Sequence, residues 1–268
     1  MDIVQWAHTN GCPLNDTIQG QRGPYKKLCA EAARSGSLEV LQWMRSKGCP
    51  WDASTCACIA ASNNLEMLER ARARGCPWDA RTCKRAAILD SLDLLIWCRA
   101  NGCPWDAATC SAMATYKGLE GVQWARSQGC PWDSRTCSAF SDQGNFEALQ
   151  WCRANGCAWD EHTWIGVVLY GTREVMQWTL DNGCPWNENV CAVAARGGKL
   201  GALKFLRANG CPWDADVCAE AARYGRLHML QWARSQGCPW DTRTVGNAII
   251  HRHERVREWA LANGCSAP

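Results

Sequence analysis

Residues 210–236 read GCPWDADVCAEAARYGRLHMLQWARSQ, and variants of this segment fill most of the 268-residue chain. The opening Gly-Cys pair recurs at a constant spacing of 27 residues from Cys49 to Cys265, in eight equal steps. Eight equal intervals do not arise by chance, so the chain is an array of short repeats. A repeat of this length cannot bury its own apolar faces, whereas stacked copies share a continuous core. The sequence therefore predicts a solenoid.

The spacing of residues within one copy predicts two helices per repeat. Asp214 is a good N-cap, and Cys218 shares a helical face with the Ala residues three and four positions later. Gly225 suits the left-handed turn that ends a helix, and Gly171 is expected to do the same at the equivalent position of its own repeat. A second helix starts near Leu227 and carries a broad apolar arc that includes Trp232. Each repeat is therefore expected to be helix, tight turn, helix, tight turn.

We expect a single repeat domain over residues 1–268. It comprises a half repeat at residues 2–10, a polar loop insert at about 15–24, and nine helix pairs at about 26–263. The last pair, at about 242–263, carries charged residues where other copies carry Leu, which is typical of a capping repeat.

Composition and charge limit the classes of partner and compartment. The net charge is only +3, from 29 basic and 26 acidic side chains, which gives no large basic field. We therefore expect neither nucleic acid nor a membrane as a partner. The longest nearly apolar run, Trp164–Gly171, is far shorter than the ~20 residues that span a bilayer. The N-terminus shows no secretory signal, so we expect a cytoplasmic protein with reduced thiols.

The segment Thr-Cys-x-x-Ala-Ala-x-x-Gly-x-Leu-Glu-x-Leu resembles the ankyrin repeat, most clearly at residues 29–41 and 218–222. It departs from that pattern in two ways, because Cys replaces Pro and the period is 27 residues rather than about 33. The missing residues fall where an ankyrin repeat makes its β-hairpin finger, so few or no strands are expected. The Gly-Cys-Pro-Trp-Asp variant is similar to divergent ankyrin arrays in large families of giant DNA viruses, algae and oomycetes.

The resemblance implies an all-α, ankyrin-like solenoid that binds proteins and catalyses no reaction. Its partner is then an unidentified protein, or a host protein in the host cytoplasm if the source is a virus, and the chain is a monomer. The residues agree with this reading, because no nucleophile elbow, phosphate-binding Gly loop or His-Glu metal motif occurs in the sequence. We therefore expect no enzyme activity, no metal and no cofactor.

The 20 Cys allow three interpretations: small core residues, disulfides or metal ligands. Equivalent Cys in adjacent repeats should lie ~8–10 Å apart, which exceeds the ~7 Å limit between Cα atoms in a disulfide. The two Cys of each repeat are too far apart in sequence for Cys-x-x-Cys metal spacing. We favour small buried hydrophobes, and a thiol-based metal or redox protein is the alternative.

Three further residue types recur with the 27-residue period. The Trp of Cys-Pro-Trp-Asp is expected to pack over the join between repeats, and the Asp after it is expected to cap the first helix. Arg recurs in the last turn of the second helix, where positive charge suits the helix dipole. The alternative for this Arg ladder is a phosphate-binding stripe for nucleic acid. Its members are Arg45, Arg72, Arg99, Arg126, Arg153, Arg207 and Arg234.

Partner binding is expected where the repeats differ, on the outer face of the first helix. Tyr at the ends of these helices are natural interface anchors. The repeat around Trp164 departs most, so its apolar run Ile165–Tyr170 is expected to mark the centre of the site, unless it only repacks around Trp164. Neutral drift on a solvated face is the alternative for the variable positions. The predicted partner-binding residues are Arg81, Lys84, Arg85, Tyr116, Arg135, His162, Ile165, Leu169, Tyr170 and Tyr224.

Overall fold

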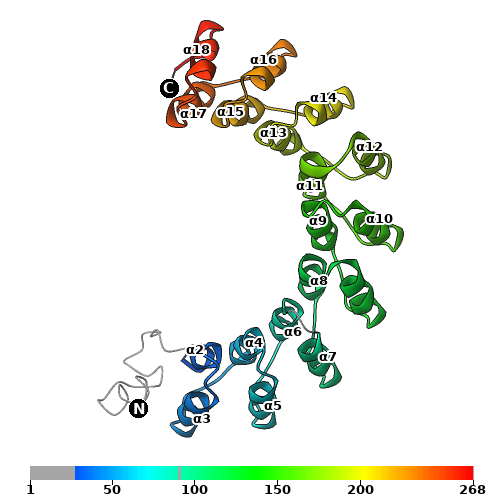
Figure 1. Ribbon diagram of the computed structural model, residues 1–268, viewed down its shortest axis with the longest axis vertical. Helices are drawn as coiled ribbons and strands as arrows, with labels where there is room; N and C mark the ends of the chain where they lie inside the picture. Colours follow the sequence, from blue (N-terminus) through cyan, green and yellow to red (C-terminus); the bar gives the residue numbers. More distant parts are fainter. Residues whose placement is uncertain (1–27, 90–91, 268) are drawn as a thin grey trace, which may run out of the picture. The chain divides into compact units, whose positions relative to one another are not determined.

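The computed structural model describes residues 28–89 and 92–267, and every regular element in these ranges is a helix (Figure 1). The prediction of an all-α solenoid without β-hairpin fingers is therefore confirmed for the described residues. The predicted half repeat at 2–10 and the loop insert at 15–24 lie outside them. Contacts between Cα atoms divide the chain into two compact units, unit 1 (Met1–Trp132) and unit 2 (Asp133–Pro268).

Unit 1 contains three helix pairs and a long element that bends into a fourth pair. Its last element, α8, turns at Gly118, whose φ of +66° only Gly adopts readily. We call the N-terminal member of each pair the first helix and the other member the second helix. The elements are α2 (Leu28–Arg34), α3 (Leu38–Ser46), α4 (Ala53–Ala61), α5 (Leu65–Ala73), α6 (Ala80–Ala87), α7 (Asp93–Ala100) and α8 (Ala107–Ser127).

Unit 2 contains five helix pairs, of which α17 and α18 form the last. The elements are α9 (Ser134–Asp142), α10 (Phe146–Ala154), α11 (Thr163–Tyr170), α12 (Arg173–Asp181), α13 (Glu188–Arg196), α14 (Leu200–Ala208), α15 (Ala215–Arg223), α16 (Leu227–Ser235), α17 (Thr242–Ile250) and α18 (Glu254–Ala262).

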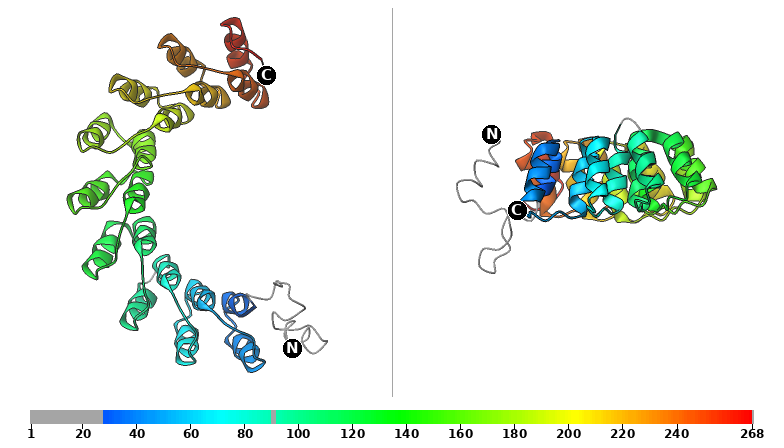
Figure 2. Two further views of the ribbon diagram at one scale, coloured as in Figure 1. Left: turned by 180° about the vertical axis from the view of Figure 1, so that it is seen from behind. Right: turned by 90° about the horizontal axis from the view of Figure 1, so that it is seen from below.

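Within each unit the helices form two rows (Figures 1 and 2). Neighbouring first helices pack on one another, as α2, α4, α6 and α8 do in unit 1. Each second helix packs mainly on the first helix of its own repeat. The core therefore runs between the first helices, while the spaces between neighbouring second helices are less tightly filled.

The Cys of the repeat are core residues, as predicted. Cys56 on α4 and Cys76 before α6 are both fully buried, and the Cys56 thiol lies 3.9 Å from the Cys76 carbonyl oxygen. Trp164 occupies the Cys56 position in its own repeat, and its indole N–H donates to the Cys184 carbonyl at 3.2 Å. A much larger side chain thus reaches the same kind of carbonyl.

Burial raises the pKa of several of these thiols, whereas hydrogen bonds with the Cys83 and Cys98 thiols lower the pKa of Cys103. Desolvation raises the pKa of Cys184 to about 12, and the nearby negative charge of Asp160 adds to the rise. A hydrogen bond with the Cys49 thiol, together with burial, raises the pKa of Cys29. The 19 Cys that the structure describes form no disulfide, and Cys58 on α4 is the one among them that is not buried. A protonated, buried thiol is a poor nucleophile.

The Trp and Arg ladders form one interlocking framework. The Arg99 guanidinium lies 4.1 Å from the centre of the Trp105 ring and donates to the Cys103 carbonyl. Trp105 in turn packs edge to face on Trp124, with the two ring centres 6.1 Å apart. Every ladder Arg stacks on the next Trp in this way at 4.0–4.4 Å. Because these guanidinium groups serve the framework, the structure argues against a phosphate-binding stripe along the Arg ladder.

The predicted helix caps are confirmed, with one correction at a turn. The carboxylate of Asp133 accepts from the Arg135 backbone N–H, and the side chain of Asn187 caps α13 in the same way. A hydrogen bond from the Arg135 side chain lowers the pKa of Asp133. The prediction of a left-handed turn at Gly171 is wrong, because its φ is −75° and its ψ is 156°.

Arg99→Ala tests the framework role of the Arg ladder. It removes both the stacking on Trp105 and the hydrogen bond to the Cys103 carbonyl, so the free energy of unfolding should fall by about 1–3 kcal/mol. Arg70 on α5 is the control, because it is exposed and pairs only with the exposed Glu66. Arg70→Ala should change the free energy of unfolding by less than about 0.5 kcal/mol. Urea unfolding followed by circular dichroism compares the two variants. Equal midpoints would show that the ladder does not stabilise the array.

Thiol counting tests the core role of the Cys. Cys12 lies outside the described residues, so Cys12→Ser removes its contribution. In this native variant one thiol should react quickly with a chromogenic disulfide reagent, and a further Cys58→Ser should abolish that reaction, because the other thiols are buried. In denaturant without reductant, all 19 described thiols should react. A smaller number in denaturant would reveal disulfides and contradict the assignment.

Candidate binding surfaces

A groove crosses the first helices of four consecutive repeats in unit 1. Its volume is about 820 Å³. Its walls come from α2, α4, α6 and the first half of α8, because the residues that vary between repeats all project from the same face of these helices. We call it the first-helix groove. It is lined by Ala30, Arg34, Ser54, Ala57, Cys58, Ala61, Arg81, Lys84, Arg85, Ile88, Ser111, Ala112, Thr115 and Tyr116.

The lining of the first-helix groove carries one sign of charge. Four of its residues are Arg or Lys, and none is Asp or Glu. Arg34 and Arg81 each form an exposed ion pair, with Glu31 and Asp79 respectively, at 2.8 Å. Lys84 and Arg85 are exposed and pair with no carboxylate in the described part of the chain. The groove therefore presents an excess of positive charge to solvent.

Four of the predicted partner-binding residues meet in this groove: Arg81, Lys84, Arg85 and Tyr116. Tyr116 stands at its α8 end with 56% of its surface exposed. Sequence reasoning missed Arg34. A signal for it existed, because Arg34 follows Cys29 by five residues, the same offset that places Ile88 and Thr115 in the groove.

The other predicted residues lie in unit 2, on or beside α9, α11 and α15. The Arg135 guanidinium lies 2.7 Å from the Asp133 carboxylate, and the His162 Nδ1 lies 3.3 Å from the Asp160 carboxylate. Ile165 and Leu169 are half-buried. Tyr170 and Tyr224 are exposed, as expected of interface anchors.

Much of the apolar run around Trp164 is explained by packing. Gly166 lets α11 approach α9 so closely that an added Cβ would lie 2.0 Å from the Ser141 carbonyl oxygen. Trp164 is fully buried, and Val167 and Val168 are buried beside it. The repacking alternative therefore accounts for most of this helix, and Tyr170 is the exposed aromatic residue that it leaves unexplained.

One group of potential metal ligands occurs in the described residues. Asp160, Glu161 and His162 place their ligand atoms within 4.8 Å of one another at the start of α11. Asp160 also accepts from the His162 backbone N–H, which is the capping role of its ladder position. Helix capping explains this arrangement without a metal.

Comparisons with known proteins identify the fold but no family. No family model matches the sequence, and no curated protein does. Among solved structures, the chain is similar to the pentatricopeptide repeat protein PPR10 in complex with an 18-nt psaJ RNA element, with a TM-score of 0.56 and 15% sequence identity. It is also similar to the same protein from maize, with a TM-score of 0.54 and 16% identity.

The similarity covers 99% and 98% of this chain but only 46% and 48% of those chains, so this chain spans about half their length. It shows a helical-repeat solenoid, while the closer ankyrin assignment stays a prediction. The expectation that nucleic acid is not a partner is wrong, because the solved chains with this fold include one in complex with RNA. That expectation rested on net charge, which says nothing about how charges are distributed. Among the described helices, none is long and apolar enough to cross a membrane. The chain is a solenoid of helical repeats.

Proposed function

We propose that this chain is a non-catalytic helical-repeat binding module, and that its first-helix groove holds single-stranded RNA. The observation that carries the proposal is a groove of about 820 Å³ lined by four cationic side chains and no carboxylate. Net charge does not oppose it, because a local cluster of cations attracts a polyanion even in a nearly neutral chain.

The groove offers the two kinds of contact that single-stranded RNA uses. Lys84 and Arg85 pair with no described carboxylate, so phosphates can bind them without displacing an ion pair. Tyr116 offers an exposed ring on which a base can stack. Because these residues come from several repeats, the ligand must be extended rather than compact.

The comparison with PPR10 supports the proposal at the level of architecture. A solved chain of the same fold class is in complex with an RNA element. At 15% identity this says nothing about individual residues. The choice of residues therefore rests on the groove of this chain alone.

Protein binding is the second candidate function. It is favoured by Tyr170 and Tyr224 in unit 2, which are 61% and 42% exposed. Exposed Tyr residues are frequent anchors of protein interfaces. If this candidate holds, replacing Ile165 and Tyr170 by Ser weakens capture of a protein partner while RNA binding is retained.

Lys84→Gln with Arg85→Gln tests the RNA proposal. Fluorescence anisotropy with a labelled oligouridylate should show a salt-dependent affinity for the native chain. The double variant should bind at least about tenfold more weakly, and its salt slope should be shallower by about 1.4, because two phosphate contacts are lost. Tyr116→Leu should weaken binding about fivefold or more by removing a stacking surface.

The matched control is Lys47→Gln with Arg74→Gln, which removes two exposed cations of unit 1 that lie outside the groove. It should leave the RNA affinity within about twofold of the native value. Equal losses in both double variants would show nonspecific attraction and contradict the proposal. Tighter binding of polyglutamate than of oligouridylate would identify the groove as a site for acidic proteins instead.

A further inference from the structure

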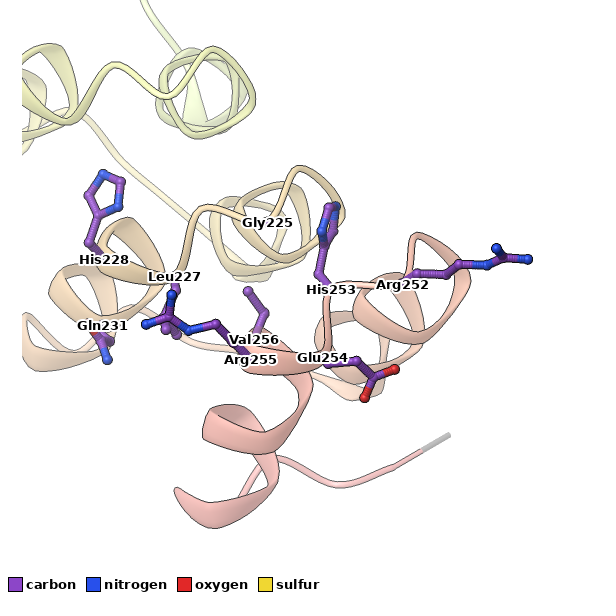
Figure 3. Close-up of a pocket in the computed structure, with 9 residues that line it drawn as sticks. All are labelled: Gly225, Leu227, His228, Gln231, Arg252, His253, Glu254, Arg255 and Val256. Atoms are coloured by element: carbon purple, nitrogen blue, oxygen red, sulfur yellow. The ribbon is translucent and has the colours of Figure 1, made fainter.

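A second cavity lies in unit 2, between the second helices α16 and α18 (Figure 3). We call it the α16/α18 pocket. Its volume of about 660 Å³ is in the range of small-molecule sites. It exists because neighbouring second helices pack mainly on their own first helices. Its lining residues are Gly225, Leu227, His228, Gln231, Arg252, His253, Glu254, Arg255 and Val256.

The rim of the pocket is mainly basic. Figure 3 shows Arg255 reaching from α18 towards α16, while the Glu254 carboxylate points away from it. Glu254 forms an ion pair with Arg257 on its own helix. In the described residues, Arg255 and His228 pair with no carboxylate. The single acidic group of the lining is thus engaged elsewhere.

His253 holds a fixed position at the edge of this pocket. Its ring Nε2 lies 3.0 Å from the Arg223 carbonyl oxygen, which orients the imidazole. Gly225 makes room for the ring, because an added Cβ would lie 2.7 Å from Nδ1. The imidazole is therefore anchored across neighbouring repeats.

Helix stability does not explain the basic residues at this place in the repeat. The repeat position of Arg255, at the start of the second helix, is acidic in six earlier copies, where a carboxylate suits the positive end of the helix dipole. The last three copies have Gly201, His228 and Arg255 instead. The N-cap also changes, because α14, α16 and α18 lack the side-chain cap that α3, α5, α10 and α12 have, although α7 lacks one as well. The acidic copies are Glu39, Glu66, Asp93, Glu120, Glu147 and Glu174.

We propose that the α16/α18 pocket binds the phosphate group of a small phosphorylated ligand. The Arg255 guanidinium supplies a planar pair of donors that fits phosphate oxygens. The His228 imidazole and the Gln231 amide add donors from α16, and Leu227 offers apolar contact to the rest of the ligand. The proposal is independent of RNA binding in unit 1, because it rests on different residues of a different unit.

Titration calorimetry with pyrophosphate at constant ionic strength tests this site. The native chain should bind one pyrophosphate. His228→Glu with Arg255→Glu restores the residue type of the earlier repeats, so the variant should fold with an equal or higher Tm while its affinity falls at least tenfold. Lys199→Asn is the matched control, because it removes a cation from the N-cap of α14 outside this pocket. It should leave the pyrophosphate affinity unchanged.

Three results would overturn the proposal. The first is the absence of saturable pyrophosphate binding to the native chain, and the second is equal binding by the His228→Glu, Arg255→Glu variant. The third is tighter binding of citrate than of pyrophosphate, which would assign the pocket to carboxylates. Lys84→Gln with Arg85→Gln should bind pyrophosphate normally, so failure of this site and failure of the RNA groove are distinguishable.

Discussion

Close packing of neighbouring first helices is the constraint on which the rest of the structure depends. A 27-residue repeat is too short to form its own core, so its apolar residues must be buried against the next copy. Small side chains such as those of Cys56 and Ala60 allow this approach, and both are fully buried. At Gly166 the helices α11 and α9 are so close that any side chain would collide with the backbone of α9. Once the first helices are packed, their outer residues necessarily form one continuous surface within a unit.

The framework and the binding surfaces use different residues of the same repeat. The ladder Arg of each second helix contacts the Trp and the Cys carbonyl of the Cys-Pro-Trp-Asp segment that follows it. Arg99, for example, contacts Trp105 and the Cys103 carbonyl. They are therefore not free to recognise a ligand. The first-helix groove and the α16/α18 pocket are instead built from residues that differ between copies. This division explains how a highly repetitive chain can still present a groove and a pocket whose linings differ from repeat to repeat.

Much of this organisation could be predicted from the sequence, because it depends on local spacing. The helix pairs, the Asp caps and the buried Cys follow from periodicity within one repeat. The first-helix groove could not be predicted from periodicity within one repeat, since it forms only when Arg34, Arg81 and Tyr116 from separate repeats are brought together. The ladder Arg was ambiguous for the same reason, because sequence alone does not show that each guanidinium stacks on the next Trp. The extended backbone at Gly171 was missed because Gly tolerates left-handed and extended conformations equally.

In the proposed arrangement, the framework residues hold the array together while the first-helix groove holds an RNA strand. Photo-crosslinking with an oligouridylate that contains 4-thiouridine, followed by mass spectrometry of the peptides, tests it most directly. Crosslinks are expected on peptides that contain Lys84, Arg85 and Tyr116. Crosslinks confined to second helices or to the ladder Trp residues, or none at all, would contradict it.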